Sequence, residues 1–232
     1  MRRVTAVLID AGRVLIHPDD TLFQRAAHAH QQPLAVGVAV RAIGRTVWEG
    51  ATAADPVAFW NSDRKVDAWA RHAGLNPRDG ARIWQQVHQA DAVTPLWSIG
   101  EPTAATALAA LAGAGYRIAG VSNNDGRLHE QLTAAGLTSY VTAIVDSAVL
   151  GIAKPDPAIF LHAAAALGIR PDQCVMIGDD PHFDIHASTR AGIGSTILID
   201  AHHDRPATWT TPACPDLGAA AALLLASETT VT

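Results

Sequence analysis

Cysteine and surplus positive charge are both scarce in this sequence of 232 residues, which has two Cys, and 17 Lys and Arg against 22 Asp and Glu. Two cysteines are too few for a disulfide framework, and Cys174 lies in an apolar run. We therefore expect Cys174 and Cys214 to be free thiols in a reducing cytoplasm. The net charge of −5 gives no basic surface field, so we expect no nucleic-acid partner.

Long apolar runs are also missing. The longest, residues 217–226, is too short to span a bilayer. The N-terminal residues 1–3 lead directly into an apolar strand, without the pattern of a signal peptide. We expect a cytoplasmic protein without a membrane partner, and the hydrophobic content of 49% is enough for a substantial core.

What the sequence does have is a change of pattern along the chain. Residues 4–9 form an apolar run that is followed by Asp10 and Gly12. A short apolar run with such an end is typical of a buried strand. Four helices then follow near residues 21–31, 34–49, 55–73 and 77–91, and residues 94–102 read as a linker. Beyond the linker, helices and strands alternate at 103–112, 116–121, 126–135, 141–145, 156–167, 174–177, 184–191 and 196–199.

This alternation predicts an α/β protein with a Rossmann-like, doubly wound parallel sheet. Residues 1–16 and 97–232 would form this core. Residues 17–96 would be a helical cap domain inserted after the first strand. An insertion at that point lies next to the carboxyl ends of the strands, where ligands bind in open parallel sheets.

Polar side chains stand at four of the predicted strand ends, where a parallel sheet would bring them together. They are Asp10, Ser122 with Asn123, Lys154 before a helix, and Asp179 and Asp180 followed by Asp184. Each has a plainer interpretation when taken alone. Ser122, Asn123 and the three later aspartates are typical of turns and helix N-caps, and lysine usually faces solvent.

Taken together and in this order, the four motifs resemble those of the haloacid dehalogenase-like (HAD) hydrolase superfamily. The resemblance covers the whole predicted core. By its position and helicity, block 17–96 resembles the cap that some members insert after the first motif.

The resemblance implies a role for each residue. Asp10 would be the nucleophile that forms an aspartyl-phosphate intermediate, and Lys154 would neutralise Asp10 and the phosphoryl oxygens. Mg²⁺ would be held by Asp10, the Gly12 carbonyl and Asp179, with Asp180 or Asp184 acting directly or through water. Ser122 and the backbone near Asn123 would hold the phosphate.

Two positions depart from the family pattern. Gly12 stands where phosphatases usually carry a second Asp, the general acid and base. Without that Asp, turnover should be restricted to substrates with better leaving groups, such as anomeric or acyl phosphates, unless another residue substitutes for it. His17, Asp20 and His182 are candidates for the substitute. Arg13 replaces a usual glycine and could bind an anionic substrate, although a solvent-facing side chain is the simpler expectation.

The leading hypothesis is therefore a Mg²⁺-dependent phosphatase, monomeric or homodimeric, that acts on a small phosphorylated metabolite. One alternative is a metal-independent 2-haloacid dehalogenase, but those enzymes carry an aromatic residue at the position of Gly12 and do not need the acidic pair at Asp179 and Asp180. Another is a catalytically weak or non-enzymatic binding protein, which Gly12 alone favours.

Overall fold

The chain divides into two compact units. The structure, a computed structural model, describes residues 4–201 and 213–229. One unit is an α/β unit formed by Met1–His17 and Ile99–Thr232, and the other is a helical unit, Pro18–Ser98.

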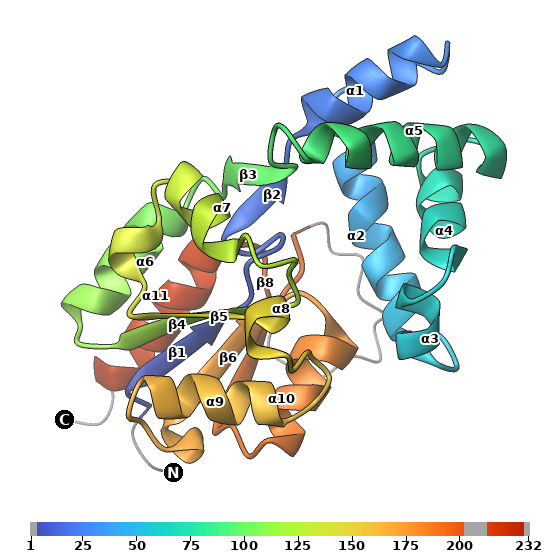
Figure 1. Ribbon diagram of the computed structural model, residues 1–232. Coiled ribbons are helices and arrows are strands. Elements are labelled where there is room, and N and C mark those ends of the chain that lie inside the picture. Colours follow the sequence, from blue (N-terminus) through green and yellow to red (C-terminus); the bar gives the residue numbers. More distant parts are fainter. Residues whose placement is uncertain (1–3, 202–212, 230–232) are drawn as a thin grey trace. The chain divides into compact units, whose positions relative to one another are not determined.

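The α/β unit is built on a parallel sheet with β1 near its centre (Figure 1). Among the described residues the sheet has six strands in the order β5-β4-β1-β6-β7-β8. Their bounds are β1 Ala6–Ile9, β4 Arg117–Ser122, β5 Ala143–Asp146, β6 Cys174–Gly178, β7 Ser195–Ile199 and β8 Ala213–Cys214. Leu8 lies opposite Ala119 on one side and Met176 on the other. The predicted parallel, doubly wound fold is confirmed.

Helices cover both faces of this sheet. Alternate strand residues such as Leu8 and Met176 pack with Phe160 of α9 (Ala158–Ala166) in one buried cluster. On the opposite side lie α6 (Ala104–Gly113) and α11 (Leu217–Thr229), which are neighbours (Figure 1). Burial on both faces explains why these strands are continuously apolar rather than alternating in polarity.

Short elements complete the α/β unit. They are α7 Leu128–Ala134, η1 Thr138–Tyr140, α8 Ser147–Leu150, η2 Pro171–Gln173, the π-helix η3 Pro181–His186 and α10 Ala187–Arg190. The single helix predicted for 184–191 is therefore a π-helix that begins three residues earlier and continues into α10. Cys174 and Cys214 are both free and buried, as expected from their number.

The helical unit has five helices among its residues. They are α1 Asp20–Ala29, α2 Val38–Ala51, α3 Pro56–Trp60, α4 Arg64–His72 and α5 Pro77–Asp91. Its core contains Phe23, Trp69 and Ile83, all buried, and Trp84 packs against it. The aromatic rings of Phe23 and Trp69 lie 5.3 Å apart, so these tryptophans serve helix packing.

The helix predicted for 55–73 is wrong, because the chain breaks it after Trp60. Ser62 donates its hydroxyl to the carbonyl of Phe59, and the Lys65 ammonium bonds the carbonyl of Trp60. These side chains satisfy the carbonyls that the end of α3 leaves open, which stabilises a stop there.

The two segments that connect the units form a β-strand each, and these two strands pair with each other. Strand β2 (Ile16–Pro18) and strand β3 (Trp97–Gly100) form a two-stranded sheet of their own. The linker expected at 94–102 therefore contains a strand, too short to show alternation in the sequence. In the described part of the chain, no helix has both the length and the apolar character needed to cross a membrane.

Candidate active site

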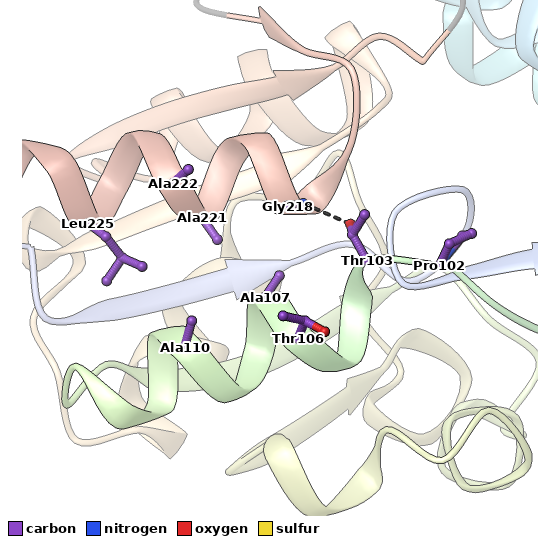
Figure 2. Close-up of a pocket in the computed structure, with 9 residues that line it drawn as sticks. All are labelled: Pro102, Thr103, Thr106, Ala107, Ala110, Gly218, Ala221, Ala222 and Leu225. Carbon is purple, nitrogen blue, oxygen red and sulfur yellow. Dashed lines mark hydrogen bonds between the residues drawn. The ribbon is translucent and has the colours of Figure 1, made fainter.

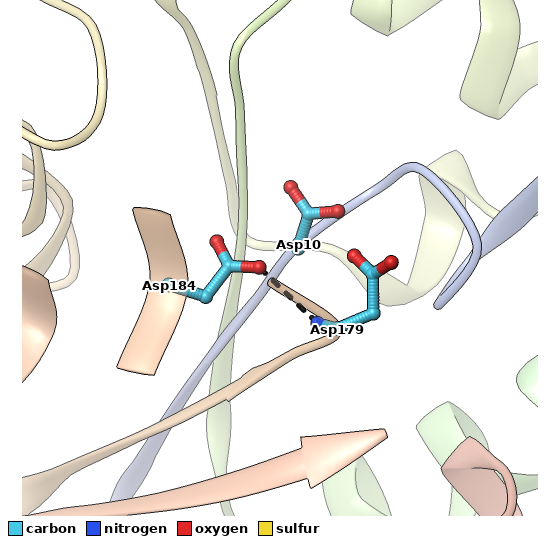
Figure 3. A group of neighbouring side chains, drawn as sticks. All are labelled: Asp10, Asp179 and Asp184. Atoms are coloured by element: carbon cyan, nitrogen blue, oxygen red, sulfur yellow. Dashed lines mark hydrogen bonds between the residues drawn. The ribbon is translucent and has the colours of Figure 1, made fainter. Parts of the chain in front are cut away.

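Three carboxylates meet at the carboxyl edge of the sheet. Asp10 follows β1 and Asp179 follows β6, and the N–H of Asp10 bonds the Ile177 carbonyl at 2.9 Å, which keeps the strand ends level. Figure 3 shows Asp10, Asp179 and Asp184 turned toward one another. Oxygen atoms from these three side chains, the acidic trio, lie within 4.8 Å of one another, and all three residues are buried.

Lys154 supplies positive charge to this trio. Its Nζ lies 2.5 Å from Asp10 Oδ1 and 2.6 Å from Asp184 Oδ1, and the residue is only 4% exposed. A buried lysine is stable only when paired, so the two carboxylates account for its position. Burial opposes the charge of Lys154, but Asp10 and Asp184 outweigh it and raise its pKa above the usual value.

Asp184 reaches the trio from η3, the π-helix. Its Oδ2 accepts the backbone N–H groups of Asp179 and Asp180, at 3.2 and 3.1 Å. Gly178 permits this approach, since a Cβ there would lie 2.4 Å from the Asp184 carboxyl group. The sequence motif from Gly178 to Asp184 thus places two carboxylates, those of Asp179 and Asp184, in the acidic trio.

Most of the chain matches a known protein family. The family model for haloacid dehalogenase-like hydrolases matches residues 4–192. The chain belongs to the haloacid dehalogenase-like hydrolase family. The resemblance inferred from the four sequence motifs is therefore confirmed.

Relatives within the HAD family include phosphatases. Phosphoserine phosphatase from Thermus thermophilus is 38% identical over 64 residues, 28% of this chain and 26% of the relative. Phosphoglycolate phosphatase from Xylella fastidiosa is 36% identical over 77 residues, 32% of this chain and 33% of the relative. These matches span about a quarter to a third of the relatives' lengths.

A solved structure from the same family shares the fold. The HAD-hydrolase YfnB from Bacillus subtilis, in a magnesium-bound form, superposes with a TM-score of 0.66 at 18% identity. That alignment covers 96% of this chain and 99% of YfnB.

The other predicted site residues lie outside the acidic trio, and each has its own partners. Ser122 is buried at the end of β4, opposite Asp146 of β5. The Asn123 side chain makes two hydrogen bonds to the backbone of Lys154: Nδ2 donates to its carbonyl at 2.9 Å, and Oδ1 accepts its N–H at 2.8 Å. Gly12 forms an isolated bridge with Ile16 in the loop after β1.

Asp180 has the N-cap role that is typical of aspartate, whereas Arg13 has an orientation that the sequence did not reveal. Asp180 Oδ1 accepts the N–H groups of His182 and Phe183, so this carboxylate is the N-cap of η3. The guanidinium of Arg13 forms an ion pair with Asp179, and its side chain is 11% exposed. The expectation that Arg13 faces solvent is wrong, because Asp179 offers it a buried carboxylate.

Burial dominates the electrostatics of the acidic residues. It raises the pKa of Asp10 to about 7, with Asp184 and Asp179 adding to the effect and Lys154 opposing it. Burial also raises the pKa of Asp179 to about 7 against the opposing charge of Arg13. The pKa of Asp180 rises to about 7 through burial and the nearby Asp184. Four carboxyl groups thus share two cations in a buried site that disfavours their charged forms, and Asp10, Asp179 and Asp184 could together hold a metal ion.

Asp146 is a site residue that sequence reasoning missed. It ends β5, and its carboxylate accepts N–H groups from Gly126, Leu128 and Ala148 at 2.9–3.2 Å. These bonds fix the loop that follows Ser122 and Asn123. Its position at a strand end, like that of Asp10, was the available signal.

The three residues considered as substitutes for the missing acid, His17, Asp20 and His182, lie in different surroundings. Asp20 Oδ2 accepts the N–H of Gly37 at 2.7 Å inside the helical unit. The ring of His182 packs against Phe183, with centroids 5.1 Å apart. His17 lies at the edge of the α/β unit, in β2.

A groove of about 400 Å³ lies elsewhere, between α6 and α11 (Figure 2). Small side chains such as Ala107 and Ala221 line it, and Thr103 Oγ1 accepts the N–H of Gly218 there at 2.9 Å. Its nine lining residues include no titratable group, so the groove offers no catalytic chemistry.

Proposed function

We propose that this HAD hydrolase is a Mg²⁺-dependent phosphatase for a small phosphorylated metabolite, with Asp10 as its nucleophile. One observation carries the proposal: Lys154 bridges Asp10 and Asp184 within the buried trio at the carboxyl edge of the sheet. A carboxylate held beside a fixed cation, with further carboxylates nearby, suits attack on an anionic phosphate.

The acidic trio fits a hard divalent cation. Carboxylate oxygens are the ligands that Mg²⁺ prefers. Burial raises the pKa values of Asp10 and Asp179 to about 7, so a bound cation would stabilise their charged forms. Asp10, Asp179 and the Gly12 carbonyl would hold the ion, with Asp184 directly, or Asp180 through water, completing the set. When bound, Mg²⁺ supplies positive charge that offsets the charge developing on the phosphoryl oxygens.

The chain's own residues would then carry two displacements at phosphorus. A carboxylate oxygen of Asp10 forms a bond to phosphorus as the ester P–O bond breaks, which gives an aspartyl phosphate. Water next attacks that phosphorus, which releases inorganic phosphate and restores the Asp10 carboxylate. Ser122 and the backbone at Asn123 hold the phosphoryl oxygens, while Lys154 neutralises them.

Gly12 cannot protonate the leaving oxygen in the first step. General acid–base catalysis is typically worth about 10²–10⁴-fold, so its loss favours substrates whose leaving group needs little help. The proton then comes from water, and we expect acyl or anomeric phosphates to be hydrolysed faster than simple alkyl phosphates.

The relatives and the inserted unit support the proposed substrate class. The phosphatase relatives are named for phosphoserine and phosphoglycolate, both small phosphorylated metabolites. We assign residues 17–96 the role of a cap domain that selects among such substrates. Cytoplasmic location, and a monomeric or homodimeric state, remain part of the same proposal.

The test is phosphate release from a panel of alkyl, acyl and anomeric phosphates, with Mg²⁺ or with EDTA. We expect Mg²⁺-dependent turnover that Asp10→Asn abolishes and Asp179→Asn weakens, while Asp125→Asn, at an exposed carboxylate, leaves it unchanged. Gly12→Asp should extend turnover to alkyl esters. Release that persists in Asp10→Asn, or an absence of release from every ester, would contradict the proposal.

A further inference from the structure

Arg13 occupies an unusual place in the loop after β1. Its backbone has φ +63°, in the left-handed region that glycine and asparagine adopt more readily than arginine. Its guanidinium reaches back to Asp179, a residue far away in the sequence but at the neighbouring strand end. A bulky residue is thus kept in an unfavourable backbone conformation with its charge directed inward.

The two cations divide the acidic trio between them. Lys154 pairs with Asp10 and Asp184, while Arg13 pairs with Asp179. Every carboxylate of the trio therefore has an internal cation beside it. Asp179 is the member whose charge depends on Arg13, since the guanidinium is the strongest influence opposing the rise in its pKa.

We propose that Arg13 is an internal competitor of the divalent cation at Asp179. This inference rests on the metal site of the proposed function. A guanidinium in contact with Asp179 would lie within a few ångströms of an ion bound by the same carboxylate, and the two positive charges repel strongly in a buried site. Metal binding therefore requires the Arg13 guanidinium to leave Asp179, and the ion pair lowers the metal affinity.

The backbone of Arg13 suggests the variant that tests this. Asparagine tolerates the left-handed region, so Arg13→Asn removes the guanidinium without adding backbone strain, and Arg13→Gly is a second variant with the same property. Arg13→Lys retains a positive charge. Arg170→Asn is the matched control, because Arg170 also pairs with an aspartate, Asp172, but at an exposed position.

The experiment measures Mn²⁺ binding to the metal-free full-length chain by the electron paramagnetic resonance signal of free Mn²⁺. We expect Arg13→Asn and Arg13→Gly to bind Mn²⁺ at least about tenfold more tightly than the wild type, as for the loss of a close charge pair. Arg13→Lys should stay closer to the wild type, and Arg170→Asn should equal it. Without metal, Arg13→Asn should unfold at a lower temperature than the wild type, and Mn²⁺ should reverse this difference.

Three outcomes would overturn the inference. Equal Mn²⁺ affinity in the wild type, Arg13→Asn and Arg13→Gly would remove the competition but leave the metal site intact. Equal tightening in Arg170→Asn would show a general charge effect. Absence of Mn²⁺ binding in the wild type and all variants would refute the metal site itself, and the competition with it.

Discussion

The side chain of Asn123 holds the backbone of Lys154. The sequence places Asn123 beside Ser122 and so suggests contact with a phosphate, yet its side chain is committed to Lys154, 31 residues away. The two hydrogen bonds use both ends of the amide. In the proposed reaction, Asn123 would therefore act through Lys154, as a positioning residue.

We predict that Asn123→Ala lowers phosphatase turnover by roughly 10- to 100-fold, because small displacements of catalytic groups are costly. It should also reduce the free energy of unfolding by about 1–2 kcal/mol for two lost hydrogen bonds. The measurements are steady-state kinetics and urea denaturation. Asn124→Ala is the control, since Asn124 bonds Gln131 instead; equal effects of the two variants on turnover would refute the positioning role.

The raised pKa of Asp180 predicts a dependence of stability on pH. Its folded pKa of about 7 exceeds the usual value of 3.8, which is expected for the unfolded chain. The folded protein therefore binds this proton more tightly. The stability that it contributes is complete below about pH 4 and is lost as the pH rises through about 7.

Asp180→Asn keeps an oxygen acceptor for the N-cap and removes the titration. With EDTA present, the thermal midpoint of the wild type should fall relative to that of Asp180→Asn as the pH rises from about 5 to 8. Thermal unfolding at several pH values measures the difference, and Asp125→Asn serves as the exposed control. Parallel curves for wild type and Asp180→Asn would contradict the prediction.

The positions of residues at predicted strand ends indicated which side chains lie together, but not which hydrogen bonds and ion pairs orient them. Asp10, Lys154, Asp179 and Asp184 do converge, because parallel strands align their carboxyl ends whatever the loops do. The ion pair of Arg13, and the commitment of Asn123 to Lys154, depend on side-chain directions between segments distant in sequence. No local pattern in the sequence encodes those directions.

At the scale of elements, Gly178 and the π-helix η3 decide the geometry of the acidic motif. The π-helical turn in this motif could not be predicted, because a π-helix has no residue pattern of its own. The break after Trp60 was missed for a related reason: serine and lysine side chains that end a helix also occur within helices.

We predict that Gly178→Ala lowers the free energy of unfolding by about 1–3 kcal/mol, since its Cβ would overlap the Asp184 carboxyl group. It should also reduce metal-dependent turnover. Gly120→Ala in β4 is the matched control, because a Cβ there lies 3.6 Å from Leu132, an ordinary contact. Urea denaturation of both variants tests this, and equal destabilisation would show that Asp184 is not the cause.

At the scale of the whole molecule, the helical unit has its two ends close together. The N–H of Asp19 bonds the carbonyl of Leu96 at 2.8 Å. All residues of the acidic trio, with Lys154 and Arg13, belong to the α/β unit. The sequence predicts a helical block at 17–96 because the hydrophobic period there differs from that of the strands, and the helical unit of the structure is Pro18–Ser98.

We predict that replacing residues 20–95 with a short glycine-rich linker leaves a folded α/β unit. It should unfold cooperatively and bind Mn²⁺ within about tenfold of the full chain, since the ligands stay in place. Discrimination among phosphate esters should decrease, because the proposed cap is gone. Circular dichroism, urea denaturation and Mn²⁺ titration are the measurements; a non-cooperative transition would show that the α/β unit depends on the helical one.

The π-helix η3 sets how many residues may separate Asp180 from Asp184. Its hydrogen bonds join residues five apart rather than four, so η3 holds one residue more than an α-helical path would. Deleting one codon between Asp180 and Asp184 would restore an ordinary helix and rotate the Asp184 carboxylate by about 100° about the helix axis. Lys154 would keep Asp10 and lose its other partner. Reading-frame-preserving deletions of this size should therefore be absent from active descendants of this chain, whereas point substitutions on the outer face of η3 should accumulate.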